Sequence, residues 1–289
     1  MNLIDDLILK LEDNLNESYI KYKKRATSNF EIYLAVNLAD SALSRLYNRF
    51  LKDITKKVEN SLMESASIDL KKEIIEQTSL GRGLGEEIVI PVVEYAKSKK
   101  RLEDDGYDFL KILYEKVYVD AYQAFEQYLF DCYKNIYMLC PKFLFKSQAI
   151  SFYYDDIFEN NNIEICREKI IDRKVKGIIQ SNNIDIVLKT FKEFGVKIEI
   201  PPNFLESIFV FSKNRNVFTH NNGIINNIYI EDLKKNKILS MYKINDSLKE
   251  KIIQEINDGN KTVDYISKYL YEKIKSKQIV NYYINNSYL

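Results

Sequence analysis

The scarcity of glycine and proline constrains the fold of this chain more than any other feature of its sequence. Its 289 residues include only 8 glycines and 4 prolines. An all-β sandwich or barrel needs many tight turns, and these two residues are the usual choice for them. The apolar residues are largely Ile, Tyr and Phe, which favour strands, but they recur at helical spacing. The sequence therefore predicts an all-α protein.

Helical periodicity covers most of the chain, and the irregular stretches between periodic segments give approximate helix bounds. We expect helices over residues 3–24, 29–62, 68–77, 107–139, 162–181, 183–194, 203–220, 246–258 and 261–277. Asp258-Gly259 is expected to separate the last two, because glycine is common just after a helix end. The segment GVKIEIPPN, residues 195–203, is expected to be extended and to lead through its prolines into the following helix.

The clearest loop holds three of the eight glycines in the sequence SLGRGLGEE. The spacing of Gly81, Gly83 and Gly85 invites comparison with a phosphate-binding loop, but no Lys-Ser/Thr follows and no βαβ pattern surrounds it. A loop or domain junction is the better interpretation. We therefore expect an N-terminal helical region of unknown role over residues 1–100 and a helical domain over residues 101–289.

The charge balance gives no general support for nucleic-acid binding, because 43 Lys and Arg residues face 42 Asp and Glu residues. A non-specific nucleic-acid coat normally carries a strong basic excess, so any RNA contact has to be local. The best local run consists of Arg167, Lys169, Arg173, Lys174 and Lys176. Its last three residues are candidate contacts to an RNA backbone. Acidic residues are interspersed in the run, so the alternative is an ordinary solvated helix face.

The cysteines and the single histidine argue against a metal site. The three cysteines form no CxxC pair, so we expect neither zinc nor another cofactor, and we interpret the thiols as core residues in a reducing cytoplasm. The N-terminal stretch carries acidic residues among its apolar ones, which is typical of an amphipathic helix rather than a signal peptide. No apolar run approaches the length of a membrane span. We expect a cytoplasmic protein without membrane contact.

One short segment carries a specific chemical pattern. His220, the only histidine, lies in KNRNVFTHNNGIIN, five residues after Arg215 and four after Asn216. The helix over 203–220 should end at Asn221-Asn222-Gly223, since Asn and Gly adopt the left-handed conformation found there. His220 would then lie in the last helical turn and share a face with Asn216. Arg215 would point about a third of a turn away, with a side chain long enough to reach round.

An arginine and a histidine at this spacing suit phosphodiester cleavage. Histidine can take a proton from a ribose 2′-hydroxyl or give one to the leaving oxygen near neutral pH. A guanidinium can hold the phosphate and offset the charge that develops on its oxygens, and the reaction requires no metal. The structural alternative is a surface histidine near a helix end, with an arginine that is favourable there because of the helix dipole.

The pattern resembles the R-x(4–6)-H signature of HEPN domains, in which the position after the arginine is typically polar. Three further segments agree with this resemblance. DAYQAFEQYLFDCYKNI, residues 120–136, resembles the first long HEPN helix, and NFLESIFVFSKNRN resembles the helix that leads into the motif. SMYKINDSLKEKIIQEI and the helix after it resemble the region that follows the motif in abortive-infection and toxin-like members. The resemblance covers residues 105 to 280 approximately.

The resemblance implies an all-α bundle of HEPN type that acts as a metal-independent endoribonuclease in bacterial anti-phage defence or a toxin–antitoxin system. Such domains usually form homodimers in which two motifs face each other, and the products carry 2′,3′-cyclic phosphate and 5′-hydroxyl ends. His220 would be the acid–base residue, Arg215 the phosphate and transition-state binder, and Asn216 a positioning group. Some members also use an acidic residue packed against the motif, for which Glu126 is the candidate. An inhibitor or sensor protein is a further expected partner.

Two other interpretations stay open at this point. The first is a non-catalytic HEPN-like module that binds RNA or protein. The second is a structural or regulatory helical protein whose N-terminal helices form a partner interface.

Overall fold

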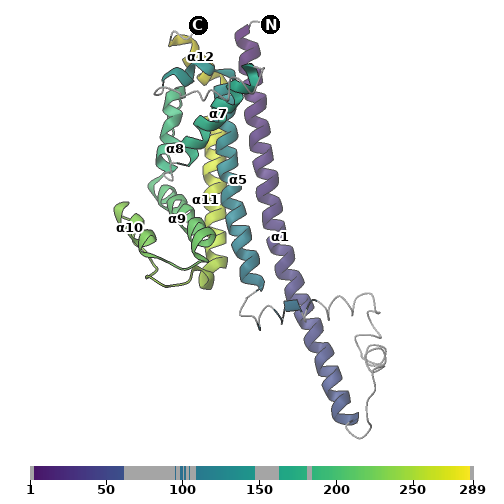
Figure 1. Ribbon diagram of the computed structural model, residues 1–289. Coiled ribbons are helices and arrows are strands. Elements are labelled where there is room, and N and C mark those ends of the chain that lie inside the picture. The colour runs from purple at the N-terminus through teal and green to yellow at the C-terminus, as the bar shows by residue number, and fades with distance from the viewer. Residues whose placement is uncertain are drawn as a thin grey trace. The chain divides into compact units, whose positions relative to one another are not determined.

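The computed structural model describes residues 3–61, 95, 98–99, 101, 104, 109–146, 163–180 and 184–286. Within these ranges the chain is helical and contains no strand, only an isolated bridge between Ile224 and Ser247 (Figure 1). The predicted all-α class is confirmed. The predicted helix over 68–77, the glycine loop and most of the expected boundary near residue 100 lie outside the described residues.

Eight α-helices and three short 3₁₀ segments have bounds within the described part of the chain. The α-helices are α1 (Leu3–Ser61), α5 (Phe109–Leu139), α7 (Ile163–Ile179), α8 (Ile184–Thr190), α9 (Pro202–Asn221), α10 (Asn227–Lys235), α11 (Ile252–Lys273) and α12 (Ser276–Asn285). The 3₁₀ segments are η1 (Pro141–Lys146), η2 (Phe191–Phe194) and η3 (Leu248–Lys251).

The chain divides into two compact units. The first comprises Met1–Asn29 together with Tyr114–Leu289, and the second comprises Phe30–Leu113. In the second unit, Asp40 accepts hydrogen bonds from Tyr95 Oη and Lys99 Nζ, each at 2.6 Å. All candidate site residues belong to the first unit.

Several predicted helices agree closely with the structure. The ranges 107–139, 162–181 and 203–220 correspond to α5, α7 and α9, and residues 196–201 lack regular structure, as expected for the extended segment. The range 183–194 is helical too, although its last turn is the 3₁₀ segment η2. Helices α10 and α12 were not predicted.

The prediction of two separate N-terminal helices, over 3–24 and 29–62, is wrong, because α1 runs without a break from Leu3 to Ser61. The intervening residues, Arg25 to Ser28, include neither glycine nor proline. Nothing there removes a backbone donor or favours a non-helical conformation strongly enough to end the helix.

The predicted helix end at Asp258-Gly259 is also wrong, because α11 continues through both residues. Gly259 is buried against α9, and a Cβ atom at this position would lie 2.9 Å from two carbon atoms of the Phe211 ring. That distance is shorter than van der Waals contact. The glycine therefore permits the close approach of two helices rather than marking the end of one.

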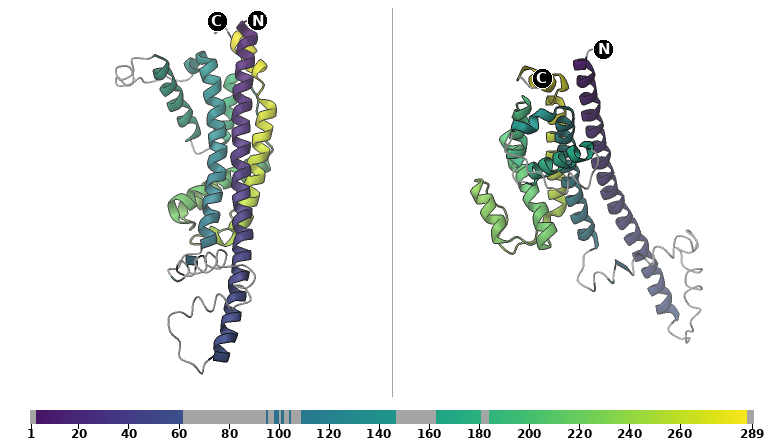
Figure 2. Two further views of the ribbon diagram at one scale, coloured as in Figure 1. Left: turned by 90° about the vertical axis from the view of Figure 1, so that its right-hand side faces the viewer. Right: turned by 45° about the horizontal axis from the view of Figure 1, so that its top comes forward.

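Three long helices pack along one another in the first unit, and the views in Figures 1 and 2 agree on this arrangement. Tyr19 of α1 stacks on Tyr271 of α11 with ring centroids 4.2 Å apart, and its ring centroid lies 5.8 Å from that of Tyr128 on α5. Lys23 of α1 forms an ion pair with Asp264 of α11 at 2.6 Å. The first turns of α1 are therefore part of the core formed with α5 and α11.

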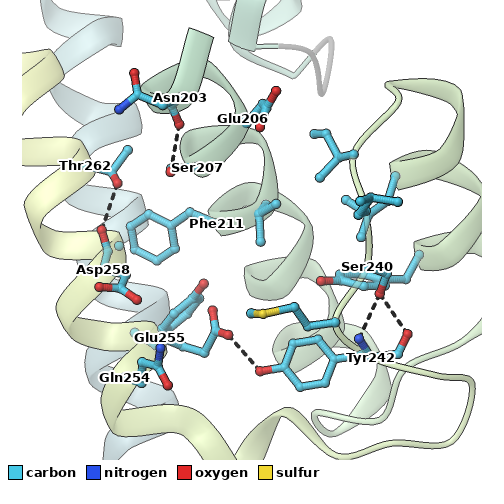
Figure 3. Close-up of a pocket in the computed structure, with 18 residues that line it drawn as sticks. Asn203, Glu206, Ser207, Phe211, Ser240, Tyr242, Gln254, Glu255, Asp258 and Thr262 are labelled. Atoms are coloured by element: carbon cyan, nitrogen blue, oxygen red, sulfur yellow. Dashed lines mark hydrogen bonds between the residues drawn. The ribbon is translucent and has the colours of Figure 1, made fainter. Parts of the chain in front are cut away.

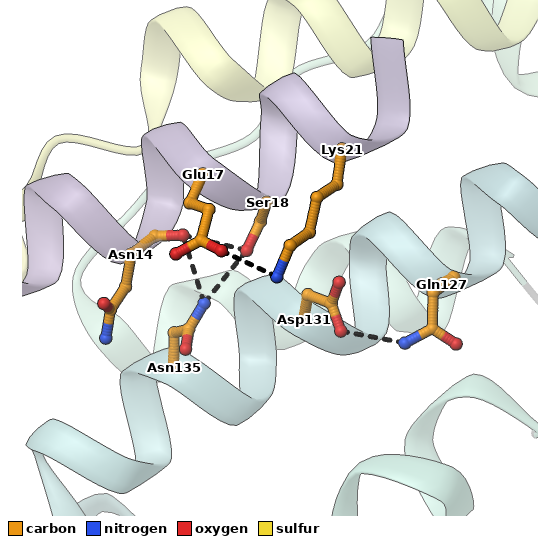
Figure 4. A network of polar contacts seen from close by, with 7 residues as sticks. All are labelled: Asn14, Glu17, Ser18, Lys21, Gln127, Asp131 and Asn135. Atoms are coloured by element: carbon orange, nitrogen blue, oxygen red, sulfur yellow. Dashed lines mark hydrogen bonds and ion pairs between the residues drawn. The ribbon is translucent and has the colours of Figure 1, made fainter. Parts of the chain in front are cut away.

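Polar contacts set the register between α1 and α5 (Figure 4). Asn135 of α5 donates from Nδ2 to the Ser18 hydroxyl of α1 at 3.0 Å and to the Asn14 carbonyl at 3.3 Å. These side chains are partly buried, so a shift of one helix along the other would leave polar groups without partners.

The contact between Gly259 and Phe211 generates a stability prediction. Gly259→Ala should lower the free energy of unfolding by about 1 to 2 kcal/mol, because overpacking against the buried ring outweighs the helix propensity that alanine adds. The matched control is Gly177→Ala in α7, where a Cβ would meet no atom within 4 Å. This control should raise the free energy of unfolding by up to about 1 kcal/mol. Urea-induced unfolding followed by circular dichroism measures both, and equal effects of the two substitutions would contradict the packing argument.

Candidate functional site

The motif helix α9 ends as its sequence predicts. Asn222, its C-cap residue, adopts the left-handed conformation with φ 51°, and Gly223 follows with φ 78°. Lys249 holds this end in place, because its Nζ contacts Asn222 Oδ1 at 2.8 Å and Glu115 of α5 at 2.7 Å. His220 lies in the last turn of α9 and is exposed. The imidazole makes no hydrogen bond to the described part of the chain.

Three consecutive residues of α9 lie in three different surroundings, because successive side chains of an α-helix are rotated by about 100°. Asn214 is fully buried, Arg215 contacts α5, and Asn216 is half-buried on the same side as His220. The orientation of Asn214 therefore determines the directions of the two residues after it.

Asn214 is the centre of a buried polar network that joins α9, α10 and α11. Its Nδ2 donates to Glu255 Oε2 at 2.7 Å, and its Oδ1 accepts from the Tyr229 hydroxyl at 2.8 Å. The Tyr242 hydroxyl donates to the other oxygen of Glu255 at 2.7 Å (Figure 3). Burial raises the pKa of Glu255, and the hydrogen bonds from Tyr242 and Asn214 offset part of that rise.

Arg215 forms an ion pair with Glu126, the acidic residue that the sequence singled out on α5. The distance from Nη2 to Glu126 Oε1 is 2.5 Å, and the guanidinium carbon lies 4.9 Å from the centroid of the Tyr122 ring. The two side chains are 19% and 25% exposed. Burial raises the pKa of Glu126, and the positive charge of Arg215 offsets part of that rise. The Nε atom of Arg215 is buried without a hydrogen-bond partner among the described residues.

Arg215 and Glu126 line a cleft of about 810 Å³, which we call the arginine cleft. Helices α1, α5, α7 and α9 all contribute to it. Its lining residues are Arg25, Gln123, Glu126, Gln127, Phe130, Lys176, Ile179, Gln180 and Arg215.

His220 and Asn216 line a different cavity of about 260 Å³, the histidine groove, between α9 and α10. Its lining residues are Lys213, Asn216, Val217, His220, Asn221, Asn226, Ile228, Tyr229 and Asp232. Lys213 and Asp232 form an ion pair at 2.6 Å. Among the described residues, none lines both the arginine cleft and the histidine groove. The structure thus brings Arg215 together with Glu126 and brings Asn216 together with His220, but it does not bring the two pairs into one cavity.

The candidate basic residues of α7 separate in the structure. Lys176 lines the arginine cleft, whereas Arg173 and Lys174 do not. The acidic residues interspersed among them, Glu168 and Asp172, contact Lys134 of α5 at 2.6 and 3.0 Å. This part of α7 therefore packs on α5 through charged contacts, and only the end of the helix reaches the cleft.

Sequence reasoning missed two residues that the structure places at the site. Arg25 lies on α1, far from the motif in sequence, and no local pattern indicated that it reaches the cleft. Asn214 did leave a signal, because it falls at helical spacing between the buried residues Phe211 and Phe218. A polar residue on an apolar helix face indicates a buried hydrogen-bond network.

The described residues contain no group of three or more His, Cys, Asp and Glu side chains arranged to hold a metal ion. Cys132 and Cys140 are buried, and burial raises the pKa of each thiol to about 12. Within the described ranges, no helix combines the length and the apolar character needed to span a bilayer.

The raised pKa of Glu126 predicts a pH-dependent effect of Glu126→Gln. In the unfolded chain the Glu126 carboxyl loses its proton near its ordinary pKa of 4.5, whereas in the folded protein it loses the proton only at a higher pH. Between these two pH values ionisation favours the unfolded state, so the contribution of Glu126 to stability falls as pH rises. The free energy of unfolding of the wild type minus that of the variant should therefore fall as pH rises above about 4.5. Urea unfolding of both proteins from about pH 4 to pH 8 measures the difference. A difference that rises with pH would mean that the charge of Arg215 outweighs the effect of burial.

Comparisons of the chain with known protein families, with curated proteins and with solved structures found no match. What this site does must therefore follow from its own residues and their contacts.

Proposed function

We propose that this protein is a metal-independent endoribonuclease of HEPN type. It cleaves RNA in the cytoplasm to 2′,3′-cyclic phosphate and 5′-hydroxyl ends, as part of a bacterial anti-phage defence or toxin–antitoxin system. The bundle that surrounds α9 is the catalytic domain in this proposal, and the chain requires no cofactor.

The contact between Arg215 and Glu126 is the observation that carries the proposal. Some HEPN domains use an acidic residue packed against the motif, and Glu126 is the candidate for it from helix position alone. In the structure these two side chains, 89 residues apart in sequence, lie 2.5 Å apart in a partly buried setting. A chance similarity of one short motif gives no reason for this pairing.

The chemistry assigned to His220 needs an accessible and unengaged imidazole, and its exposed position at the end of α9 supplies one. In the proposed reaction the 2′-oxygen of a ribose attacks the adjacent phosphorus, and the bond from phosphorus to the 5′-oxygen breaks. The 2′-hydroxyl loses a proton and the departing 5′-oxygen gains one, and His220 serves as the acid–base group. Arg215 would offset the charge on the phosphate oxygens, while Asn216, on the face of α9 that carries His220, would help to position the substrate.

A homodimer completes the proposed site, because Arg215 and His220 of one chain line different cavities. Ile228, which lines the histidine groove with His220, is 68% exposed, and Ile224, four residues after His220 in the sequence, is 39% exposed. Apolar side chains at this place favour burial by a second copy of the same surface, which would set the two motifs opposite each other. An inhibitor or sensor protein is the further partner in this proposal.

A non-catalytic module that binds RNA or protein is the second candidate. The engagement of Arg215 with Glu126 and Tyr122 favours it, because a carboxylate and a ring already hold this arginine in place without substrate. This candidate predicts binding without turnover.

The first functional prediction concerns His220→Ala. The variant should lose at least about 100-fold in the rate of cleavage of a mixed-sequence single-stranded RNA in EDTA, because the acid–base group is removed. Its thermal unfolding should match that of the wild type, since the side chain is exposed. Ser207→Ala, an exposed position nearer the start of the same helix, is the control and should cleave normally. Equal cleavage by the wild type and the His220 variant would reject the assignment, and product ends should be identified in each case.

The second functional prediction concerns Arg215→Lys. Lysine keeps the positive charge but cannot contact a carboxylate or phosphate through two parallel donors and stacks less well on Tyr122. Cleavage should fall at least about tenfold, with most of the loss in kcat, because the guanidinium is assigned to the transition state. Steady-state kinetics of the purified variant measures this effect, and near-normal kcat would contradict the assigned role.

A further inference from the structure

The arginine cleft carries more positive charge than the motif alone supplies. Arg25 comes from α1, Lys176 from α7 and Arg215 from α9, while Glu126 is the only acidic residue among the described residues that line the cleft. Three cations and one carboxylate give the lining a formal charge of +2, whereas the whole chain carries only +1. Positive charge is thus concentrated locally in a protein that has little of it overall.

Two of these cations are free to bind a ligand. Arg25 and Lys176 are exposed, and neither forms an ion pair or hydrogen bond with the described part of the chain. Arg215, in contrast, is paired with Glu126. The cations available to an incoming anion therefore come from outside the motif, on α1 and α7.

The register of α1 against α5 brings Arg25 to this cleft. Ser18 of α1 meets Asn135 of α5, and the two helices run in opposite directions (Figures 1 and 4). Two turns beyond Ser18, Arg25 lies beside the part of α5 that holds Gln127, two turns before Asn135. The same hydrogen bonds that align the helices therefore position this arginine.

The uncharged lining is suited to nucleobases. Gln123, Gln127 and Gln180 contribute side-chain amides, each of which can donate and accept hydrogen bonds. Phe130 contributes a partly exposed aromatic ring. Cations from three helices, amides and a ring in one cleft match a short single strand, whose phosphates need cations and whose bases need stacking and hydrogen-bonding partners.

We infer that the arginine cleft binds the backbone of a single-stranded RNA segment, and that Arg25 and Lys176 are phosphate contacts in it. The N-terminal part of α1 is thereby a component of the substrate site and not only a packing element. This inference rests on the proposed function for its choice of RNA, but it names binding residues that the motif does not contain.

The effect of removing these two contacts can be estimated from counterion release. For single strands, the slope of log K against log salt is about −0.7 for each phosphate neutralised. Loss of two contacts should reduce the magnitude of this slope by about 1.4. Over the tenfold range of salt from about 1 M to about 0.1 M, this change in slope corresponds to a loss of RNA affinity of roughly 25-fold at the lower salt concentration.

The test uses full-length protein with His220→Ala, so that the RNA stays intact. Binding of a fluorescent 12-nucleotide single-stranded RNA is followed by anisotropy at several KCl concentrations. Arg25→Gln/Lys176→Gln should show the reduced affinity and slope just given. The matched control is Lys24→Gln/Lys169→Gln, which removes two exposed cations from the same two helices outside the cleft and should change affinity less than about twofold. Circular dichroism checks that both double variants unfold at the temperature of the parent protein.

Equal losses of affinity in the two double variants would overturn the inference, because binding would then depend on overall charge. Absence of RNA binding by the parent protein would overturn it as well, as would displacement of the RNA by polyglutamate at equal charge concentration. A failure of the proposed function has a different signature. In that case RNA binding depends on Arg25 and Lys176, yet protein with an intact His220 does not cleave. The opposite failure is also recognisable. If protein with an intact His220 cleaves RNA but Arg25→Gln/Lys176→Gln leaves RNA affinity unchanged, the proposed function stands and the assignment of the arginine cleft is wrong.

Discussion

The buried side chain of Asn214 fixes the rotation of helix α9 about its axis, and the directions of the neighbouring motif residues follow from that rotation. Its amide is held by Glu255 and Tyr229, both on neighbouring elements. A turn of the helix by one residue would remove these partners from the buried amide and would leave one oxygen of the Glu255 carboxylate without its donor, each at a cost of about 1 to 3 kcal/mol. The Arg215 side chain therefore points towards α5, and the Asn216 side chain points towards α10.

Apolar and polar contacts constrain α9 in complementary ways. The ring of Phe211 against Gly259 sets how closely α9 approaches α11, because Gly259 places no side chain between that ring and the backbone of α11. That ring also packs against Tyr118 of α5 in a T-shaped arrangement, with centroids 4.5 Å apart. These contacts determine the spacing of the helices but tolerate small rotations, since dispersion forces have little directionality. The hydrogen bonds of Asn214 supply the directional constraint that the aromatic contacts lack.

Local rules predicted what depends on neighbours in sequence. Periodicity located α5, α7 and α9, and the residues Asn222 and Gly223 gave the end of the motif helix, because each of these features needs only a few adjacent residues. The same rules failed at Gly259, where contact with Phe211, a residue far away in the sequence, explains why glycine lies inside a helix and not at its end. Glu126 was proposed through a resemblance, and its contact with Arg215 depends on how α5 and α9 pack. No sequence pattern could place Arg25 in the cleft, since that depends on the register between α1 and α5.

The ion pair between Arg215 and Glu126 has a consequence for which anions the arginine cleft retains. A lone phosphate approaching Arg215 meets a carboxylate 2.5 Å from the guanidinium, and repulsion from that carboxylate cancels much of the attraction. In the proposed site, the other phosphates of a longer strand would contact Arg25 and Lys176, which form no ion pair with the described part of the chain. In the proposed site, the placement of these cations on three helices would therefore favour longer ligands, because a free nucleotide or inorganic phosphate can contact fewer of them at once.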